Sequence, residues 1–232
     1  ADICIYGGAA GGGKSYGLLL EATRHLSNPF FEAVIFRQSR PQIMSAGGLF
    51  ATSQEIYPRI GGRSVLTPDI QWRFPSGAKI TFAHMFYEKE KYNWQGSQIP
   101  LLMFDELVHF TESQFFYMFS RNRSTCGVKP YIRATCNPDG ESWVARFIDW
   151  WIDPETGYAD ESKCGKLRYF VRNNNITHWA DTREELWETF NLRTEDERNT
   201  VKSVSFISAR VTDNKVLLRH DPGLHQAAQR RI

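Results

Sequence analysis

A glycine-rich segment near the amino end has residue types that could hold a phosphate group. The pattern G-x-x-x-x-G-K-[ST] is matched by Gly8, Ala9, Ala10, Gly11, Gly12, Gly13, Lys14 and Ser15. Glycines let the backbone turn tightly and direct N–H groups inward, and a helix that starts at the loop adds a favourable field for an anion. In such loops the lysine faces the β- and γ-phosphates and the hydroxyl binds Mg²⁺. We therefore expect residues 8–15 to bind ATP, with Ser15 as one ligand of Mg²⁺.

A pair of carboxylates follows an apolar run later in the chain. Asp105 and Glu106 come directly after residues 101–104, which read LLMF. A buried strand that delivers two acids at its carboxyl end has the Walker B arrangement, in which the first acid holds Mg²⁺ and the second polarises the attacking water. A solvated acidic turn is the alternative interpretation, and the phosphate loop makes it the weaker one.

A third polar segment, Thr135-Cys136-Asn137-Pro138, ends another apolar run. Thr135 and Asn137 could donate hydrogen bonds to the γ-phosphate or to the attacking water, and Pro138 would restrict the exit of the chain. An ordinary Asn-Pro turn explains the same residues equally well on spacing alone.

These three segments need elements that bring them together. Hydrophobic patterning predicts strands at residues 2–6, 32–36, 71–74, 78–83, 100–104, 131–135, 166–172 and 204–207. It predicts helices at residues 15–26, 41–57, 111–119 and 141–152, the second weakened by Gly47 and Gly48, and a charged helical face at 182–202. Strand, helix and strand within the first 36 residues indicate a βαβ unit and a parallel sheet. Because ligands of such sheets lie beyond the carboxyl ends of the strands, all three segments are expected at one edge.

Composition excludes several other classes of protein. The chain has 232 residues, of which 28 are Lys or Arg and 26 are Asp or Glu, so its net charge of +2 disfavours a protein held on a polyanion by bulk charge. No apolar stretch approaches the length that spans a bilayer, which excludes a membrane protein. The four cysteines form no CxxC pair and the histidines show no ligand spacing beside them, so reduced thiols are expected rather than a zinc site or disulfides.

The ordered set of motifs resembles the large terminase subunit of tailed bacteriophages. The resemblance rests on GGAAGGGKS, LLMFDE and ATCNPDG in this order, and on FISARVTDNKVL at residues 206–217, and so spans nearly the whole chain. It implies a P-loop NTPase fold of the RecA/ASCE kind, with a mostly parallel central sheet flanked by helices. It also implies an ATP-hydrolysing, Mg²⁺-dependent motor that packages double-stranded viral DNA into procapsids.

The resemblance further implies partners, a location and a division of the chain. Copies of the motor would form a ring at the portal protein, act with the small terminase subunit in the cytoplasm of the infected host, and contact DNA phosphates without reading sequence. The isolated domain would be a monomer. Residues 1–210 would be the ATPase domain without its adenine-contacting segment, and residues 211–232 a tail or linker towards a nuclease domain. No nuclease residues are assigned.

A positive group is expected near the transition-state charge, because an arginine finger contributes roughly 10³ to 10⁵ in rate. Neither the phosphate loop nor the stretch before Asp105 offers an arginine. Arg121 and Arg123 are the nearest candidates, acting on the ATP of a neighbouring copy, and surface ion pairs or DNA contacts are the alternatives. For Arg37, at the end of the second strand, a structural or indirect role is favoured over a phosphate contact. The candidate catalytic residues are therefore Lys14, Glu106, Asn137, Arg121 and Arg123, and the candidate metal ligands are Ser15 and Asp105.

Two other functions fit part of the pattern. A P-loop kinase would need an arginine-rich lid and a substrate acid, and a nucleotide-dependent switch would bind ATP with little turnover. Glu106 argues against both, because a carboxylate that activates water serves hydrolysis. A helicase would be close in mechanism, but no further helicase motif is present.

Overall fold

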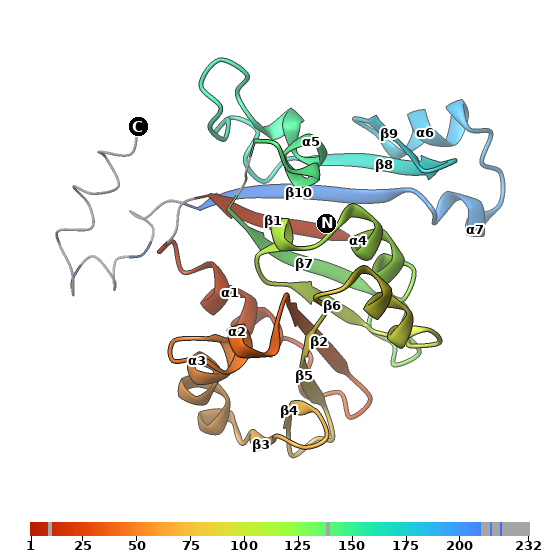
Figure 1. Ribbon diagram of the computed structural model, residues 1–232. Coiled ribbons are helices and arrows are strands. Elements are labelled where there is room, and N and C mark those ends of the chain that lie inside the picture. Colours follow the sequence, from red (N-terminus) through yellow and green to blue (C-terminus); the bar gives the residue numbers. More distant parts are fainter. Residues whose placement is uncertain (9–10, 138–139, 210–213, 215–218, 220–232) are drawn as a thin grey trace.

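The computed structural model describes residues 1–8, 11–137, 140–209, 214 and 219. Within these residues the backbone forms a ten-stranded sheet with the strand order β3-β4-β5-β2-β6-β7-β1-β10-β8-β9, and helices lie on both of its faces (Figure 1). Most of the expected tail at 211–232 lies outside the described residues.

The middle of the sheet consists of strands that run parallel to one another. They are β1 (Ile3–Gly8), β2 (Glu32–Arg37), β5 (Lys79–His84), β6 (Leu101–Phe104), β7 (Tyr131–Cys136) and β10 (Lys202–Ala209). Parallel strands are covered on both faces and therefore read as nearly continuous apolar runs, and all four residues of β6 are buried. The predicted mostly parallel sheet is confirmed.

The outer strands run antiparallel to their neighbours. They are β3 (Arg63–Val65) and β4 (Ile70–Arg73) at one end of the sheet, and β8 (Leu167–Asn173) and β9 (Ile176–Ala180) at the other. The predicted hairpin of residues 71–74 and 78–83 is confirmed by the antiparallel pairing of β4 with β5. Strands β3 and β9 were not predicted.

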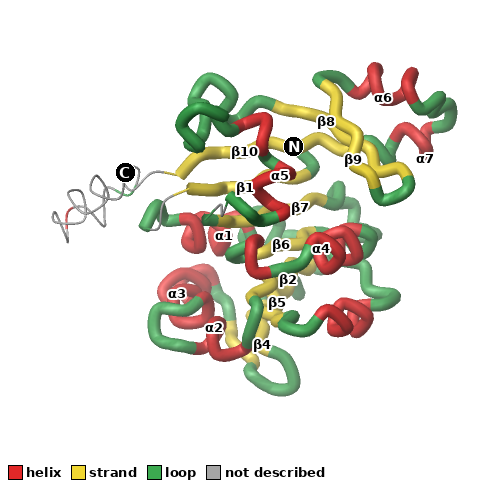
Figure 2. The backbone as a smooth tube through the Cα atoms, turned by 45° about the horizontal axis from the view of Figure 1, so that its top comes forward, coloured by secondary structure: helices red, strands yellow, loops and turns green. Residues whose placement is uncertain are grey.

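The helices divide between the two faces of the sheet, as Figure 2 shows from a second direction. The α-helices are α1 (Lys14–Glu21), α2 (Arg40–Met44), α3 (Leu49–Ile56), α4 (Glu112–Phe119), α5 (Trp143–Phe147), α6 (Arg183–Thr189) and α7 (Glu195–Arg198). Short 3₁₀ helices are η1 (Tyr57–Ile60), η2 (Glu88–Trp94), η3 (Leu107–His109) and η4 (Asp149–Trp151). None of the described helices is long and apolar enough to cross a lipid bilayer.

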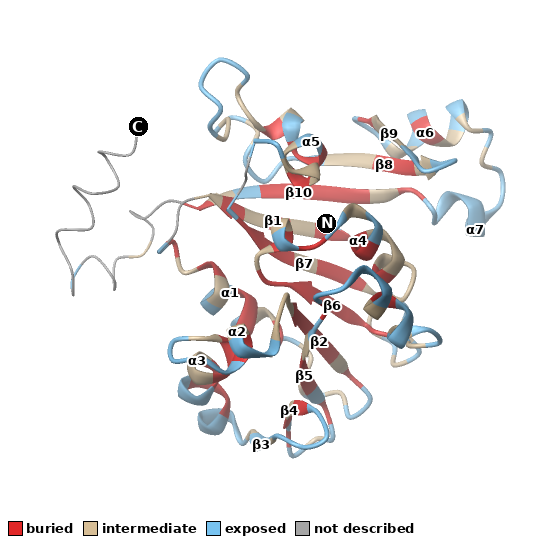
Figure 3. Ribbon diagram, viewed as in Figure 1, coloured by how far each residue is buried: buried red, intermediate tan, exposed pale blue. Residues whose placement is uncertain are grey.

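Two apolar cores follow from the alternation of side chains along each strand. On β2, Ala33 and Ile35 pack with residues of α1, α2 and α3, whereas Val34 and Phe36 pack with residues of α4 and α5. Figure 3 shows the buried central strands between these layers. The helix layers hold the carboxyl ends of the central strands in fixed relative positions.

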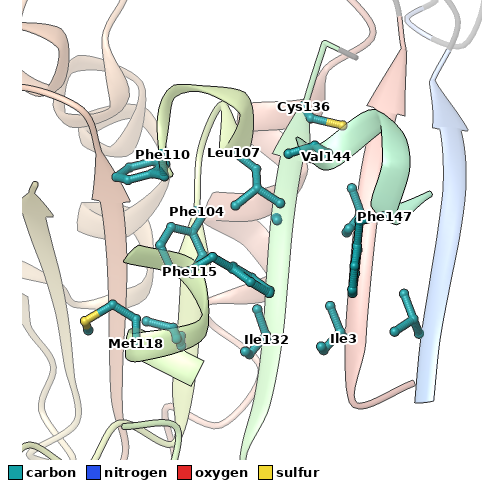
Figure 4. Close-up of a cluster of buried hydrophobic side chains, with 14 of the residues drawn as sticks. Ile3, Phe104, Leu107, Phe110, Phe115, Met118, Ile132, Cys136, Val144 and Phe147 are labelled. Carbon is teal, nitrogen blue, oxygen red and sulfur yellow. The ribbon is translucent and has the colours of Figure 1, made fainter. Parts of the chain in front are cut away.

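The core beneath α4 and α5 is mainly aromatic. Phe104 of β6 lies 5.1 Å from Phe110 and 5.5 Å from Phe115, measured between ring centroids. Ile132 of β7 and Phe147 of α5 belong to the same cluster (Figure 4). Offset and edge-on aromatic contacts of this kind stabilise a core beyond simple area burial. The cluster therefore fixes β6 against β7, the two strands that precede the polar segments.

Two predicted helices were wrong in extent. The helix expected at 41–57 is divided into α2 and α3, because the chain turns at Gly47, whose φ of 75° favours glycine. The helix expected at 141–152 is the short α5 followed by η4.

Candidate nucleotide site

The three polar segments meet at the carboxyl edge of the parallel strands. Gly8 ends β1, Asp105 follows β6, and Asn137 follows β7. Strand β7 lies between β1 and β6, with Thr135 opposite Tyr6 of β1. The segments are therefore adjacent in space although they lie far apart in the chain.

The phosphate loop has the backbone geometry that its glycines allow. Gly8, Gly11 and Gly13 have φ values of 129°, 82° and 75°, and a Cβ atom at Gly8 would collide with the carbonyl oxygen of Ala209. Helix α1 begins immediately after Gly13, at Lys14. Ala9 and Ala10, which complete the motif, lie outside the described residues. The start of α1 directs its free N–H groups towards the loop, which suits an anion.

The ammonium group of Lys14 joins two of the segments. Its Nζ donates hydrogen bonds to the carbonyl oxygen of Gly8 at 3.0 Å and to Oδ1 of Asn137 at 2.7 Å. The side chain is buried, and burial lowers the pKa of the Lys14 ammonium, while the nearby carboxylates of Glu106 and Asp105 act in the opposite direction. A partly desolvated cation beside the loop would attract phosphate strongly.

Asp105 is the most heavily bonded carboxylate of the site and is fully buried. Its Oδ1 accepts hydrogen bonds from the hydroxyls of Ser15 at 2.9 Å and Thr135 at 2.6 Å. Its Oδ2 lies 2.7 Å from Nε of Arg37. These two atoms form a close ion pair. Neither of them makes a hydrogen bond, so the N–H group of Arg37 does not point at the carboxylate oxygen. Asp105 thus connects α1, β7 and β2.

Glu106 adopts an unusual backbone conformation. Its φ of 60° and ψ of 64° are left-handed, and every other non-glycine residue with positive φ in the described part of the chain is an asparagine. Its backbone N–H donates to Oγ1 of Thr135 at 2.9 Å, so one hydroxyl holds both acids of the pair. Strained backbone that its surroundings hold in place is common at functional sites.

The two candidate finger arginines lie far from this site. Arg121 and Arg123 follow α4, and the carbonyl of Arg121 accepts a hydrogen bond from the N–H of Ile99, just before β6 begins. They are therefore at the amino edge of the parallel strands, one strand length from the phosphate loop of their own chain. The Arg121 side chain lies over the Tyr117 ring at 5.4 Å and contacts Ser120, whereas Arg123 is exposed.

Two residues at the site were not assigned to it from the sequence. Arg37, for which the sequence favours a structural or indirect role, pairs with Asp105. Asn214 donates from Nδ2 to the carbonyl oxygen of Gly11 at 2.8 Å and thereby contacts the phosphate loop. The sequence signal for Arg37 is its place at the end of a buried strand next to the strand that carries Asp105. For Asn214 the signal is its place in residues 206–217, the last of the segments that carry the resemblance to large terminase subunits.

A hollow of about 620 Å³ adjoins the site along the α1 side of the sheet. Its lining includes Lys14 and Thr135, Ala1 and Leu167, and further residues of α1, β1, β7 and β10. Of the described residues of the phosphate loop, Lys14 alone lines the hollow, so the hollow is not itself the place where phosphates would bind.

The residues present fit a magnesium ion. Ser15 and Asp105 are already in contact, and a hydroxyl with a carboxylate is a donor set that Mg²⁺ accepts when nucleotide phosphates and water complete its shell. Within the described residues no group of three His, Cys, Asp or Glu side chains could form a metal cage. A cage is not required, because Mg²⁺ in nucleotide sites keeps few protein ligands.

Comparison with known proteins agrees with this geometry. The chain is similar to the large terminase of a thermophilic bacteriophage in complex with ADP, with a TM-score of 0.54 and 15% sequence identity over 97% of this chain and 44% of that one. It is similar also to the large terminase ATPase domain of Thermus phage P74-26, with a TM-score of 0.50 and 14% identity over 95% and 80% of the two chains. The chain thus spans less than half the length of the ADP-bound terminase. No curated protein matches it.

These likenesses confirm the predicted P-loop NTPase fold. The family described as "Terminase large subunit, T4likevirus-type, N-terminal" has a sequence model that matches residues 5–229. That match includes the phosphate loop, the acidic pair and the Thr-x-Asn segment. The chain therefore belongs to the family of terminase large subunits, of which it represents the amino-terminal part.

Proposed function

We propose that this chain is an ATP-hydrolysing motor domain that drives the packaging of double-stranded viral DNA into procapsids. The observation that carries the proposal is the hydrogen-bonded set in which Lys14, Ser15, Asp105 and Asn137 meet from three separate parts of the chain. The family of the chain and the ADP complex of the thermophilic phage relative support the same conclusion.

The phosphate loop would hold the triphosphate of ATP. Backbone N–H groups of residues 8–15 and the start of α1 would bind the phosphate oxygens, and the Lys14 ammonium would lie on the β- and γ-phosphates. Ser15 and Asp105 would hold Mg²⁺, which supplies charge neutralisation on the β- and γ-oxygens.

Glu106 is the group that we assign to the attacking water. As a carboxylate it would orient the water and accept its proton as the oxygen approaches the γ-phosphorus, while ADP leaves. The left-handed backbone and the hydrogen bond of its N–H to Thr135 keep this residue at the end of β6, next to Asp105. Positioning of the water rather than covalent chemistry is the expected contribution, as in other phosphoryl transfers.

Strand β7 would couple the state of the nucleotide to movement. It carries Thr135, which bonds both acids of the pair, and it ends next to Asn137, which bonds Lys14. A γ-phosphate that competes for Lys14 would release Asn137, so the end of β7 would differ between the ATP and ADP states.

An arginine finger from a neighbouring copy fits the position of Arg121 and Arg123 at the opposite edge of the sheet. Arg123 is the better candidate, because Arg121 is already engaged with Tyr117 and Ser120. Copies would then act as a ring at the portal protein, together with the small terminase subunit, in the cytoplasm of the infected host. The isolated domain would be a slow monomer.

Steady-state phosphate release with and without double-stranded DNA tests the proposal. We expect the Glu106→Ala variant to lose at least about a hundredfold in rate, because a positioned general base contributes roughly 10² to 10⁴. Glu184→Ala removes an exposed glutamate of α6 and serves as the matched control, with an unchanged rate. For Arg123→Ala the loss is expected only at protein concentrations at which copies associate.

The other functions would give different results in the same assay. A kinase would need an added acceptor, and its phosphate release without one would be unaffected by Glu106→Ala. A nucleotide-dependent switch would turn over slowly even with double-stranded DNA and at protein concentrations at which copies associate. Either result would contradict the motor.

A further inference from the structure

A row of three cations crosses the outer strands of the sheet, away from the nucleotide site. Arg63 of β3 lies opposite Arg73 of β4, and Arg73 lies opposite Lys79 of β5. Directly opposite residues on neighbouring strands project from the same face, and neighbouring strands are about 4.8 Å apart. All three side chains are exposed, so they form a line about 10 Å long on one face of the sheet.

The fold itself gives no reason for this row. Like charges placed directly opposite each other destabilise a strand pair. Within the part of the chain that the structure describes, the nine ion pairs include none that involves Arg63, Arg73 or Lys79. Glu32 of β2 is the acid opposite Lys79, and its Oε1 accepts a hydrogen bond from Thr81. Arg73 donates from Nε to the neutral Oε1 of Gln71, and Glu32 lies opposite Lys79, so the row of three cations keeps a net positive charge that an external anion could satisfy.

The surface beside the row is hollowed. A depression of about 710 Å³ is lined by Arg63 and Arg73 together with Gly61, Gly62 and Pro75. Strands β3 and β4 lie at the far end of the sheet from β1 (Figure 1), and Figure 3 shows β3 as exposed. The hollow and the row thus form a positively charged surface that the nucleotide does not use.

We infer that Arg63, Arg73 and Lys79 bind the phosphate backbone of duplex DNA. One strand of a duplex carries a phosphate about every 3.4 Å along the axis, so a row of about 10 Å faces about three phosphates. Arginine side chains bind phosphate oxygens through a planar fork of N–H donors. Contacts of this kind read no sequence and are weak enough to be remade as a polymer moves. The choice of DNA as the polyanion rests on the proposed function.

The salt dependence of DNA binding tests this inference. The probe is a fluorescent duplex of about 30 base pairs and mixed sequence, titrated with the full chain at several salt concentrations. We expect the Arg63→Ala/Arg73→Ala variant to bind more weakly by roughly tenfold for each arginine at about 0.1 M salt, and the slope of log K against log salt to fall by about 1.8. Lys89→Ala/Lys166→Ala removes the same charge from exposed positions in η2 and just before β8, and should change affinity less than about twofold.

Two further measurements keep the result interpretable. Binding of a fluorescent ATP analogue should be unchanged in the Arg63→Ala/Arg73→Ala variant. A wild-type chain that does not bind the analogue would contradict the proposed function rather than this inference. If the double variant does not fold, Arg63→Gln and Lys79→Gln are each expected to lower the slope by about 0.9. The inference is overturned by an unchanged slope, by an equal loss in the lysine control, by a wild-type chain that does not bind the duplex, or by tighter binding to a single strand.

Discussion

The ion pair between Arg37 and Asp105 offers a quantitative test of how the site is held together. Arg37 ends β2, Asp105 follows β6, and their Nε and Oδ2 atoms are 2.7 Å apart. Replacement of Arg37 by methionine removes the positive charge and keeps most of the aliphatic volume. Asp105 would then remain fully buried with a carboxylate oxygen that has lost its cation.

The size of the effect follows from the surroundings of the pair. Removing one partner of a buried ion pair costs about 3–5 kcal/mol. The lower end applies here, because Oδ1 of Asp105 keeps its two hydroxyl donors and the Arg37 side chain is 19% exposed. We expect the free energy of unfolding to fall by about 3 kcal/mol in Arg37→Met, and Tm to fall by about 6–12 °C for a chain of this size.

Urea unfolding followed by circular dichroism measures this change. Arg40→Met is the control, since Arg40 is an exposed arginine close by in the chain, and its loss should stay within about 0.5 kcal/mol. The double variant Arg37→Met/Asp105→Asn removes both charges, so no unpaired charge stays buried. Its free energy of unfolding should therefore be about 2 kcal/mol higher than that of Arg37→Met. A loss below about 1 kcal/mol in Arg37→Met, or a double variant no more stable than the single one, would refute the reasoning.

Two other predictions concern titrating groups. Burial tends to raise the pKa of Asp2, but hydrogen bonds from Lys129 and Ser203 outweigh burial and hold the pKa of this carboxyl well below its usual value. The ionised Asp2 therefore stabilises the folded protein above about pH 4, and this stabilisation is lost as the pH falls towards the folded pKa. Asp2→Asn should flatten the acid limb of the urea midpoint against pH, and an unchanged limb would contradict this. Burial also raises the pKa of the Cys136 thiol to about 12, whereas Cys164 is exposed, so iodoacetamide should label Cys164 first and reach Cys136 only on unfolding. Peptide mass spectrometry checks the order, with Cys164→Ser as the control, and rapid labelling of Cys136 in the folded protein would count against it.

The parts of the site that were predictable from the sequence are those that local spacing defines. The phosphate loop is defined by consecutive residues alone, and the pair Asp105 and Glu106 by the apolar run before it. The expectation that they meet at one edge followed from the rule for parallel sheets and agrees with the hydrogen bond between Ser15 and Asp105. Their roles in hydrolysis stay predictions.

The pairing of Arg37 could not be predicted in the same way. It depends on β2 lying beside β6 with Phe36 opposite Phe104, and neither the neighbour nor the register is encoded in a short motif. The side chain of a strand-terminal arginine can reach several partners, and only the sheet order selects one. The partners of Arg121 and Arg123 likewise depend on neighbours in space. The sequence alone therefore did not decide between a role as arginine finger and a role in surface ion pairs or DNA contacts.

Individual elements of the fold were predicted wrongly where the conformation of a turn outweighs the hydrophobic pattern. Strand β9 was overlooked, although Asn174 and Asn175 both have positive φ and form the two-residue turn that joins it to β8. That Asn-Asn pair was the available signal. The helix expected at 41–57 was assigned in spite of its two glycines, which are the residues at which the chain turns.

The place of β1 in the sheet has a consequence for how the protein is made. Strand β1 pairs with β7 on one side and with β10 on the other, and its partners in β10 are about 200 residues later in the chain. During synthesis, a nascent chain that has not yet emerged as far as Ala209 leaves one edge of β1 open, and Gly8, where the phosphate loop begins, lacks its partner Ala209 in β10. Ribosome-bound intermediates would therefore be unable to bind nucleotide until translation of the last central strand is complete, and chaperones would meet an unpaired apolar strand until then.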